Sequence, residues 1–182
     1  MPIDPEELRV RLQSEVKQDD ISGISLAAVL LPLVEAAGWS IVFTRRSDAL
    51  ARHSGEISFP GGKVDEGETS VGAALRETHE ELGIDPADVE ILGALPTAFT
   101  IVSGYQIAPW VGVIPSTDFR PSESEIAEVL VIPISDLLAD GVRREQKFIR
   151  AGGIYENPAY DVDHHIIWGA TARILSEFLE LI

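Results

Sequence analysis

Short apolar runs bounded by turn residues recur along most of this 182-residue chain. Runs of this kind, rich in Val, Ile and aromatic residues, are typical of β-strands. We expect strands at residues 26–34, 39–44, 57–59, 89–92, 105–114, 128–133 and 165–168. Gly38 lies between the first two runs, which indicates that a turn joins those two strands.

Other segments carry apolar residues at helical spacing. Helices are expected at residues 4–17, 70–82, 134–138 and 171–181. The first has Asp4 as a suitable N-cap and Pro5 at its first helical position, and the second ends at Gly83, a common residue after a helix. A turn at Gly61-Gly62 is expected to lead the chain from residues 57–59 toward the second helix. Strands interleaved with helices indicate a layered α/β or α+β domain.

Size and composition favour one compact domain spanning residues 1–182. The hydrophobic content of 45% is ample for a single core at this length. The longest apolar run, residues 26–34, is much shorter than the roughly 20 residues that a spanning helix needs, and it contains Pro32. Residues 1–4 show no basic region followed by an apolar stretch, and the chain has no cysteine. We therefore expect a soluble cytoplasmic protein without membrane contact.

The net charge of −16 argues against nucleic acid as a partner, because proteins that grip phosphate backbones normally present a basic face. The 14 basic residues are nevertheless unevenly spread. Five lie around the central motif and four lie further on: Arg45, Arg46, Arg52, Lys63 and Arg76, then Arg143, Arg144, Lys147 and Arg150. Such clusters can attract a small polyphosphate, whereas the alternative is that each cation pairs with a neighbouring acid on the surface.

Three carboxylates share one face of the helix expected at residues 70–82. Glu77, Glu80 and Glu81 fall at positions i, i+3 and i+4, and like charges so placed cost roughly 0.2–0.5 kcal/mol per pair. A glutamate pair alone is usually a solvated surface, but a bound divalent cation explains the full cluster better. Oxygen ligands, no cysteine and only four histidines favour Mg²⁺ or Mn²⁺ over zinc.

The spacing around these carboxylates is specific. Gly62, Glu68, Arg76, Glu77, Glu80, Glu81 and Gly83 follow the pattern Gly-x5-Glu-x7-Arg-Glu-x2-Glu-Glu-x-Gly. This segment, residues 62–84, resembles the signature box of the Nudix hydrolases, which cleave a nucleoside diphosphate linked to another group. Thr78 stands where an aliphatic residue is commoner, and we expect it to face the sheet. The resemblance implies an α/β/α sandwich with a mixed central sheet.

A second motif narrows the resemblance. Residues 41–47, then Leu50, Arg52, His53 and Gly55, lead into the sequence Phe-Pro-Gly-Gly at residues 59–62. This stretch resembles the motif of the coenzyme A pyrophosphatase branch, although Val42-Phe43 replaces a leucine pair and Ala51 stands where a basic residue is frequent. Residues 167–175 are also similar to this branch, so the resemblance extends over about residues 26–179.

The branch implies cleavage of coenzyme A or acyl-CoA to 3′,5′-ADP and 4′-phosphopantetheine or its acyl form. A relative that acts on ADP-ribose, NADH or a damaged nucleoside triphosphate is the nearest alternative. A non-catalytic nucleotide-binding module is a further one, which retention of the carboxylates and of Arg76 opposes. The family also makes a homodimer plausible.

Roles follow for individual residues. Glu77 and Glu81, one helical turn apart, are the expected metal ligands, with Glu80 as a further one. The resemblance adds the carbonyl of Gly62 as a metal ligand, and Arg76 is expected to hold the ligands in place by pairing with a glutamate such as Glu68.

Substrate contacts and the general base are less constrained by the sequence. The expected substrate-binding residues are Arg45, Arg46, Arg52, His53 and Lys63. The general base is a box glutamate or a downstream carboxylate, and Glu123, Glu125 and Glu128 are the downstream candidates. A cluster of Asp161, Asp163, His164 and His165 could also bind a metal, but it lies at the edge of a strand with no identifiable partner, so a metal site is the less favoured interpretation.

Overall fold

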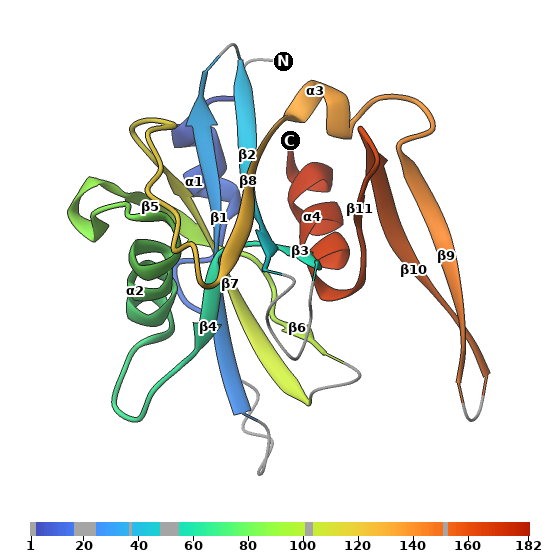
Figure 1. Cartoon of the computed structure of the whole chain (residues 1–182), viewed down its shortest axis with the longest axis horizontal. Coiled ribbons are helices and arrows are strands. Elements are labelled where there is room, and N and C mark those ends of the chain that lie inside the picture. The colour runs from blue at the N-terminus through green and yellow to red at the C-terminus, as the bar shows by residue number, and fades with distance from the viewer. Residues whose placement is uncertain (1–2, 17–24, 37, 48–54, 101–103, 151–152) are drawn as a thin grey trace.

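The computed structural model describes residues 3–16, 25–36, 38–47, 55–100, 104–150 and 153–182 (Figure 1). Its helices are α1 (Pro5–Arg11), α2 (Ser70–Leu82), the short helix η1 (Pro86–Asp88), α3 (Ile134–Leu137) and α4 (Gly169–Leu181). Its strands are β1 (Ser25–Glu35), β2 (Trp39–Arg46), β3 (Ile57–Ser58), β4 (Gly61–Lys63), β5 (Glu90–Ala94), β6 (Ala98–Phe99), β7 (Tyr105–Val113), β8 (Ile126–Pro133), β9 (Arg143–Arg150), β10 (Gly153–Val162) and β11 (His165–Ile167). None of the helices in these segments is long and apolar enough to span a membrane.

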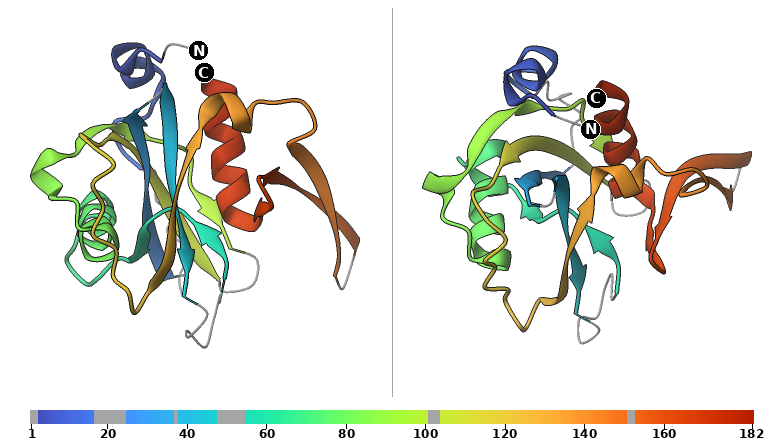
Figure 2. Two further views of the ribbon diagram at one scale, coloured as in Figure 1. Left: turned by 45° about the horizontal axis from the view of Figure 1, so that its top comes forward. Right: turned by 90° about the horizontal axis from the view of Figure 1, so that it is seen from above.

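The central sheet is mixed, as expected. Its main path runs β3-β2-β1-β7-β5, with β4 beside β1, β6 beside β7 and β8 beside β2. Strands β1 and β7 are parallel, whereas the other pairs are antiparallel. Helix α2 covers one face of the sheet and α4 the other (Figures 1 and 2). A separate three-stranded sheet, ordered β11-β10-β9, lies beyond α4.

Strand β1 is buried on both faces, which explains its almost continuous apolar sequence. Leu31 and Leu33 belong to the larger core, which includes Phe178 of α4. Ala28 and Leu30 alternate with them and pack in the cluster beneath α2. That cluster is rich in alanine, so the backbone of α2 can approach the sheet closely.

Helix α2 begins and ends where the sequence predicts. The Thr69 side chain accepts a hydrogen bond from the Gly72 N–H at 3.1 Å, and Gly83 follows the helix in the left-handed conformation. Thr78 is fully buried against the sheet, and its hydroxyl donates to the Ala74 carbonyl at 2.7 Å. The expected orientation of Thr78 is therefore confirmed.

Two expectations near the termini of elements are wrong. Helix α1 ends at Arg11 and not near Lys17, because Leu12 is extended and Gln13 forms a bridge with Ala94. Residues 61–63 form strand β4 along β1, where the sequence predicted only a turn. Asp4 does cap α1, since its side chain accepts from the Glu6 N–H at 2.9 Å.

Besides β4, three strands were not predicted: β6, β9 and β10. Strand β9 reads Arg-Arg-Glu-Gln-Lys-Phe-Ile-Arg and lacks the apolar alternation of a half-buried strand. Its described side chains, residues 143–147, are all exposed, which accounts for the missing pattern. The Asp163-His164 pair, with positive φ at both residues, forms the turn between β10 and β11. Asp161 on β10 and His165 on β11 flank this turn.

Candidate active site

Gly61 and Gly62, which precede α2, are closely packed against β1 and against a side chain of α2, respectively. Strand β4 pairs with β1 so closely that a Cβ atom at Gly61 would overlap the Ala28 carbonyl, and Gly61 has a φ of 153°. A Cβ atom at Gly62 would overlap the carboxylate of Glu77. Glycine is therefore required at both positions, because Gly61 lies against the backbone of β1 and Gly62 lies against the Glu77 carboxylate.

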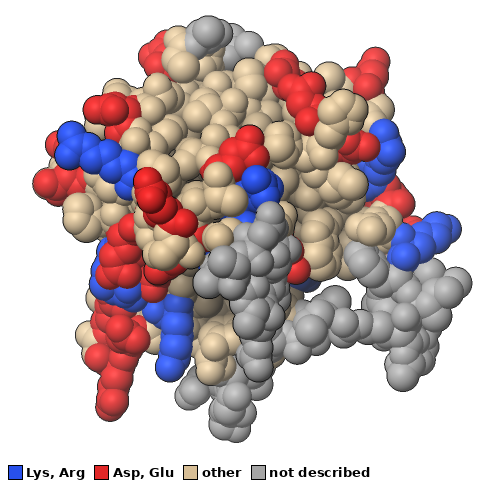
Figure 3. Space-filling model, viewed as in Figure 1, with Lys and Arg blue, Asp and Glu red and all other residues tan. Residues whose placement is uncertain are grey.

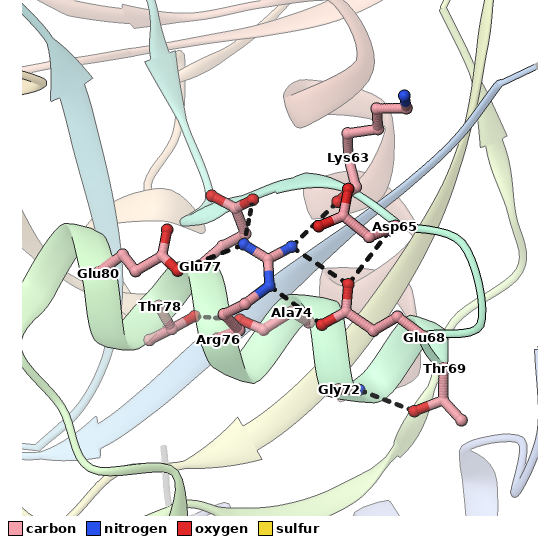
Figure 4. Close-up of polar contacts among 10 residues, drawn as sticks. All are labelled: Lys63, Asp65, Glu68, Thr69, Gly72, Ala74, Arg76, Glu77, Thr78 and Glu80. Carbon is pink, nitrogen blue, oxygen red and sulfur yellow. Dashed lines mark hydrogen bonds and ion pairs between the residues drawn. The ribbon is translucent and has the colours of Figure 1, made fainter.

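Arg76 connects the loop before α2 to the acidic face of the helix (Figure 4). Its guanidinium forms a two-pronged pair with Glu68, through Nε at 3.0 Å and Nη2 at 3.2 Å. Nη2 also donates to the Lys63 carbonyl at 3.2 Å, while Nη1 reaches Glu77 at 2.8 Å and Glu80 at 3.4 Å. The expected pair between Arg76 and Glu68 is present, and the same guanidinium holds two other box carboxylates.

The hydrogen bonds of this network shift the pKa of both partners. Arg76, together with the Asp65 N–H, lowers the pKa of the Glu68 carboxyl. Glu68 and then Glu77 raise the pKa of Arg76, so the guanidinium stays charged. The rigid fork of the guanidinium donates to three carboxylates and to the Lys63 carbonyl, so Arg76 fixes their positions in a way that a lysine could not.

Glu81 is the buried member of the cluster, with only 3% of the residue exposed. The Gly61 N–H donates to its Oε2 at 3.3 Å. The pKa of the Glu81 carboxyl is raised to about 7, mainly by burial and to a smaller extent by the charges of Glu77 and Glu125. The Gly61 N–H and Arg46 act in the opposite direction and lower this pKa. A buried acid whose ionised form is disfavoured by two other carboxylates is an environment that a bound cation would stabilise.

The loop after β7 approaches the end of α2. The Arg120 N–H donates to the Leu82 carbonyl at 2.8 Å, and the Ser122 N–H donates to the Glu81 carbonyl at 3.0 Å. The Glu125 carbonyl accepts from the Ser47 N–H at 2.8 Å, which ties this loop to the end of β2. Glu125 thus comes close enough to affect the pKa of Glu81, although it lies 44 positions beyond that residue in the sequence.

Glu128, another of the downstream candidates, is engaged elsewhere. The Arg45 Nε donates to its Oε2 at 3.0 Å, so Arg45 and Glu128 form a partly exposed ion pair across β2 and β8. Glu123 is exposed and has no resolved interaction with Glu81. Of the three candidates, Glu125 is the one that contributes to the raised pKa of Glu81.

The expected substrate-binding residues fall in different places. Arg46 lies near Glu81, and its Nε atom is buried without a hydrogen-bond partner in the described structure. Lys63 is exposed at the end of β4, beside the Arg76 network. Arg52 and His53 lie outside the described residues.

The two basic segments do not form one pocket. Arg143, Arg144 and Lys147 lie on β9, on the opposite side of the molecule from α2 (Figures 1 and 2). Each pairs with an acid of the small sheet: Glu145 at 2.9 Å, Asp161 at 3.1 Å and Glu156 at 2.9 Å, respectively. Figure 3 shows basic side chains interspersed among acidic ones on this view, without a continuous basic patch. The interpretation of surface pairing therefore holds for Arg143, Arg144 and Lys147, whereas the side chain of Arg150 lies outside the described part of the structure.

The donor set fits a hard divalent cation. The candidate ligands are carboxylates and a glycine carbonyl, all oxygen, and Glu77 already lies directly against the backbone of Gly62. Among the described residues, no three His, Cys, Asp or Glu side chains converge closely enough to form a complete metal site. Arg76 instead occupies oxygen atoms of Glu77 and Glu80.

Comparison with known proteins agrees with this geometry. The NUDIX domain family matches residues 25–152. The uncharacterized Nudix hydrolase NudL of Citrobacter koseri is 39% identical over 153 residues, which are 83% of this chain and 79% of that protein.

Solved structures share the fold. A MutT/nudix family protein from Enterococcus faecalis gives a TM-score of 0.59 at 15% identity, covering 88% of this chain and 62% of that one. A C. elegans Ap4A hydrolase binary complex gives 0.52 at 24% identity, covering 60% of this chain and 81% of that one. At these identities the likeness concerns the arrangement of strands and helices alone.

Proposed function

Since the chain belongs to the Nudix hydrolases, which are pyrophosphohydrolases, we propose that it cleaves the diphosphate bridge of coenzyme A or of an acyl-CoA. The products are 3′,5′-ADP and 4′-phosphopantetheine or its acyl form. The observation that carries this choice is the segment of residues 41–62, which resembles the coenzyme A pyrophosphatase motif and leads directly into the box.

The described part of that segment borders the carboxylate cluster, which supports a role in binding substrate. Strand β2 ends at Arg46, next to Glu81. Phe59 stacks on Phe43 with ring centroids 5.0 Å apart, and this contact anchors the chain just before Gly61. A guanidinium with an unpaired Nε beside the cluster is suited to a phosphate oxygen.

Glu77 and Glu81 are our proposed ligands for Mg²⁺ or Mn²⁺, with Glu80 and the Gly62 carbonyl as further ligands. The ion would polarise the phosphoryl group and lower the pKa of a bound water. The chain itself contributes the position of the ligands: Arg76 holds Glu77, and the Gly61 N–H holds Glu81. Desolvation of Glu81 makes its charge worth more to a cation than an exposed carboxylate would be.

Glu125 is our choice for the group that accepts a proton from the attacking water. Its effect on Glu81 and its attachment to Ser47 support this choice, because both bring it to the box from outside α2. Glu128 is less suitable because Arg45 already pairs with it. A base must lie within hydrogen-bond reach of the water, so position decides before pKa does.

The test is cleavage by the purified protein with Mg²⁺ or Mn²⁺, with products separated by chromatography. We expect coenzyme A to give 3′,5′-ADP with a kcat/KM well above the values for dephospho-coenzyme A, ADP-ribose and NADH. A lost charge-assisted contact to the 3′-phosphate is worth roughly 1.5–3 kcal/mol, or about ten- to hundredfold. A preference for ADP-ribose would refute coenzyme A as the substrate but would still agree with hydrolysis of a diphosphate bridge. Failure to cleave any of these diphosphates would favour a non-catalytic binding module.

We also propose that residues 1–182 act as one domain. Helix α1 packs against β5, and Arg11 donates to the Leu181 carbonyl near the end of α4. Arg173 of α4 donates in turn to the Phe99 carbonyl of β6. These contacts link the segments outside the family match to the central sheet.

A further inference from the structure

Strand β9 forms the outer edge of a hairpin that projects from the body of the protein. It pairs with β10 on one side, and no described strand lies on its other side. Figures 1 and 2 show the hairpin standing away from the central sheet. The side chains of residues 143–147 are all exposed, so neither face of this part of β9 is covered. Because a two-stranded ribbon is only marginally stable in water, such an edge is a template for another strand.

Pro158 determines which backbone groups of β9 face outward. It lies opposite Glu145 and has no N–H, so this pair cannot be of the hydrogen-bonded kind. In an antiparallel ladder the two kinds of pair alternate, so Gln146 bonds with Asn157 on β10. The N–H and C=O groups of Glu145 and Lys147 therefore point to the outer edge.

We propose that β9 pairs antiparallel with β9 of a second copy of this chain, across a two-fold axis at Gln146. The outward N–H and C=O groups of one β9 strand must lie opposite the outward groups of the other strand. An axis between two residues would set an outward residue opposite an inward one, so the axis has to pass through a residue. An axis at Glu145 sets two carboxylates opposite each other, and an axis at Lys147 sets two ammonium groups opposite each other, which is destabilising. An axis nearer either end leaves less of the eight-residue strand to pair.

The axis at Gln146 gives complementary charges. It places Glu145 opposite the partner's Lys147, and two-fold symmetry repeats this contact. Within one chain Glu145 pairs with Arg143 and Lys147 pairs with Glu156, each at 2.9 Å, and these ion pairs are exposed. The new contact joins them into a row of alternating sign that crosses the interface.

This pattern also limits the association to a dimer. A strand edge with charges of a single sign repels every copy of itself. The mixed charges of β9 instead favour pairing with the axis at Gln146 and disfavour pairing with the axis at Glu145 or at Lys147. The pairing is isologous, so it closes and leaves no outer edge on either hairpin. Because a single strand edge buries less than a standard interface, the dimer forms with an affinity that depends visibly on protein concentration.

Cysteine crosslinking tests the register, since the chain contains no cysteine of its own. The pair at the axis is non-hydrogen-bonded, with Cα atoms about 4.5 Å apart, which is within reach of a disulfide. We expect Gln146→Cys to give a disulfide-linked dimer under mild oxidation, at low protein concentration. Glu145→Cys, off the axis, and Glu156→Cys, on the inner strand and similarly exposed, are the matched controls. The proposal would be overturned if Gln146→Cys formed the disulfide-linked dimer no faster than either control.

Charge reversal tests the contact without a crosslink. Lys147→Glu turns both symmetric contacts from attraction to repulsion, so we expect the dimer Kd from analytical ultracentrifugation to rise about tenfold. The double change Glu145→Lys with Lys147→Glu should bring the Kd back toward the wild-type value. Arg120→Glu makes the same change of charge away from β9 and should leave the Kd unaltered. A wild-type protein that stays monomeric at every concentration, or an unchanged Kd in Lys147→Glu, would refute the interface.

Discussion

The buried carboxyl of Glu81 should make the stability of the metal-free protein depend on pH in an unusual direction. Its pKa is about 7 in the folded protein, against an ordinary value of 4.5. Below about pH 4.5 both folded and unfolded chains hold this proton, so its contribution to stability is complete. Between these values the unfolded chain releases the proton first, and the folded state loses stability as the pH rises.

The difference between the two pKa values corresponds to about 3 kcal/mol, which is fully lost above about pH 7. Glu81→Gln keeps the size of the side chain and removes the charge. In EDTA we therefore expect this variant to unfold at higher urea concentration than the wild type at about pH 8, with the difference shrinking toward about pH 5. Added Mg²⁺ should stabilise the wild type and not the variant, because binding to the native state raises its stability.

Urea denaturation followed by circular dichroism measures this difference directly. Other carboxyl groups also titrate, Glu68 with a lowered pKa among them, but their contributions cancel when variant and wild type are compared at the same pH. Glu80→Gln is the matched control, since Glu80 lies on the same helix and is exposed. The reasoning is refuted if Glu81→Gln and the wild type show the same pH dependence in EDTA.

The remaining predictions concern turnover. Glu77→Gln or Glu81→Gln should lower kcat by at least about 10²–10³ at saturating Mg²⁺ with the fold retained, and near-normal turnover of either would exclude it as a ligand. Gly62→Ala should lower turnover and raise the Mg²⁺ concentration needed for half-maximal rate, because its Cβ overlaps the Glu77 carboxylate; an unchanged Mg²⁺ titration would contradict this. Arg46→Ala should raise KM more than it lowers kcat, and this increase in KM should shrink at high salt. Arg45→Ala should raise KM less, because it removes only a surface ion pair. Equal KM values in the two variants would favour surface pairing for both arginines.

The local part of the site was predictable because its constraints are local. The bounds of α2, its Gly83 end and the burial of Thr78 all follow from residues in or next to one helix. The pairing of Arg76 with Glu68 spans eight positions and was expected from the family resemblance. Long apolar strands such as β1 and β7 were likewise clear, since both are buried in the central sheet.

Features that depend on distant residues were not predictable from sequence patterns. Strand β9 carries no apolar alternation because its described side chains face water, so its pairing with β10 left no trace in the periodicity. Strand β4 was read as a turn because glycine is a weak strand former, although β1 supplies its hydrogen bonds. Our proposed choice among the downstream acids depends on the path of the loop after β7, because Glu125 affects the pKa of Glu81 while Glu128 pairs with Arg45.

If the carboxylate cluster binds the metal as we propose, the arrangement that serves activity also lowers the stability of the metal-free protein. Burying Glu81 beside Glu77 disfavours the ionised, metal-free protein, and Arg76 offsets only part of that cost because it contacts Glu77 and not Glu81. The same desolvation strengthens the attraction of Glu81 for a cation. An exposed carboxylate at this position would lower the stability of the metal-free protein less, but it would also bind the cation more weakly. The metal is therefore expected to act on folding as well as on catalysis, so that one titration of stability against Mg²⁺ reports on the ligand assignment without any substrate.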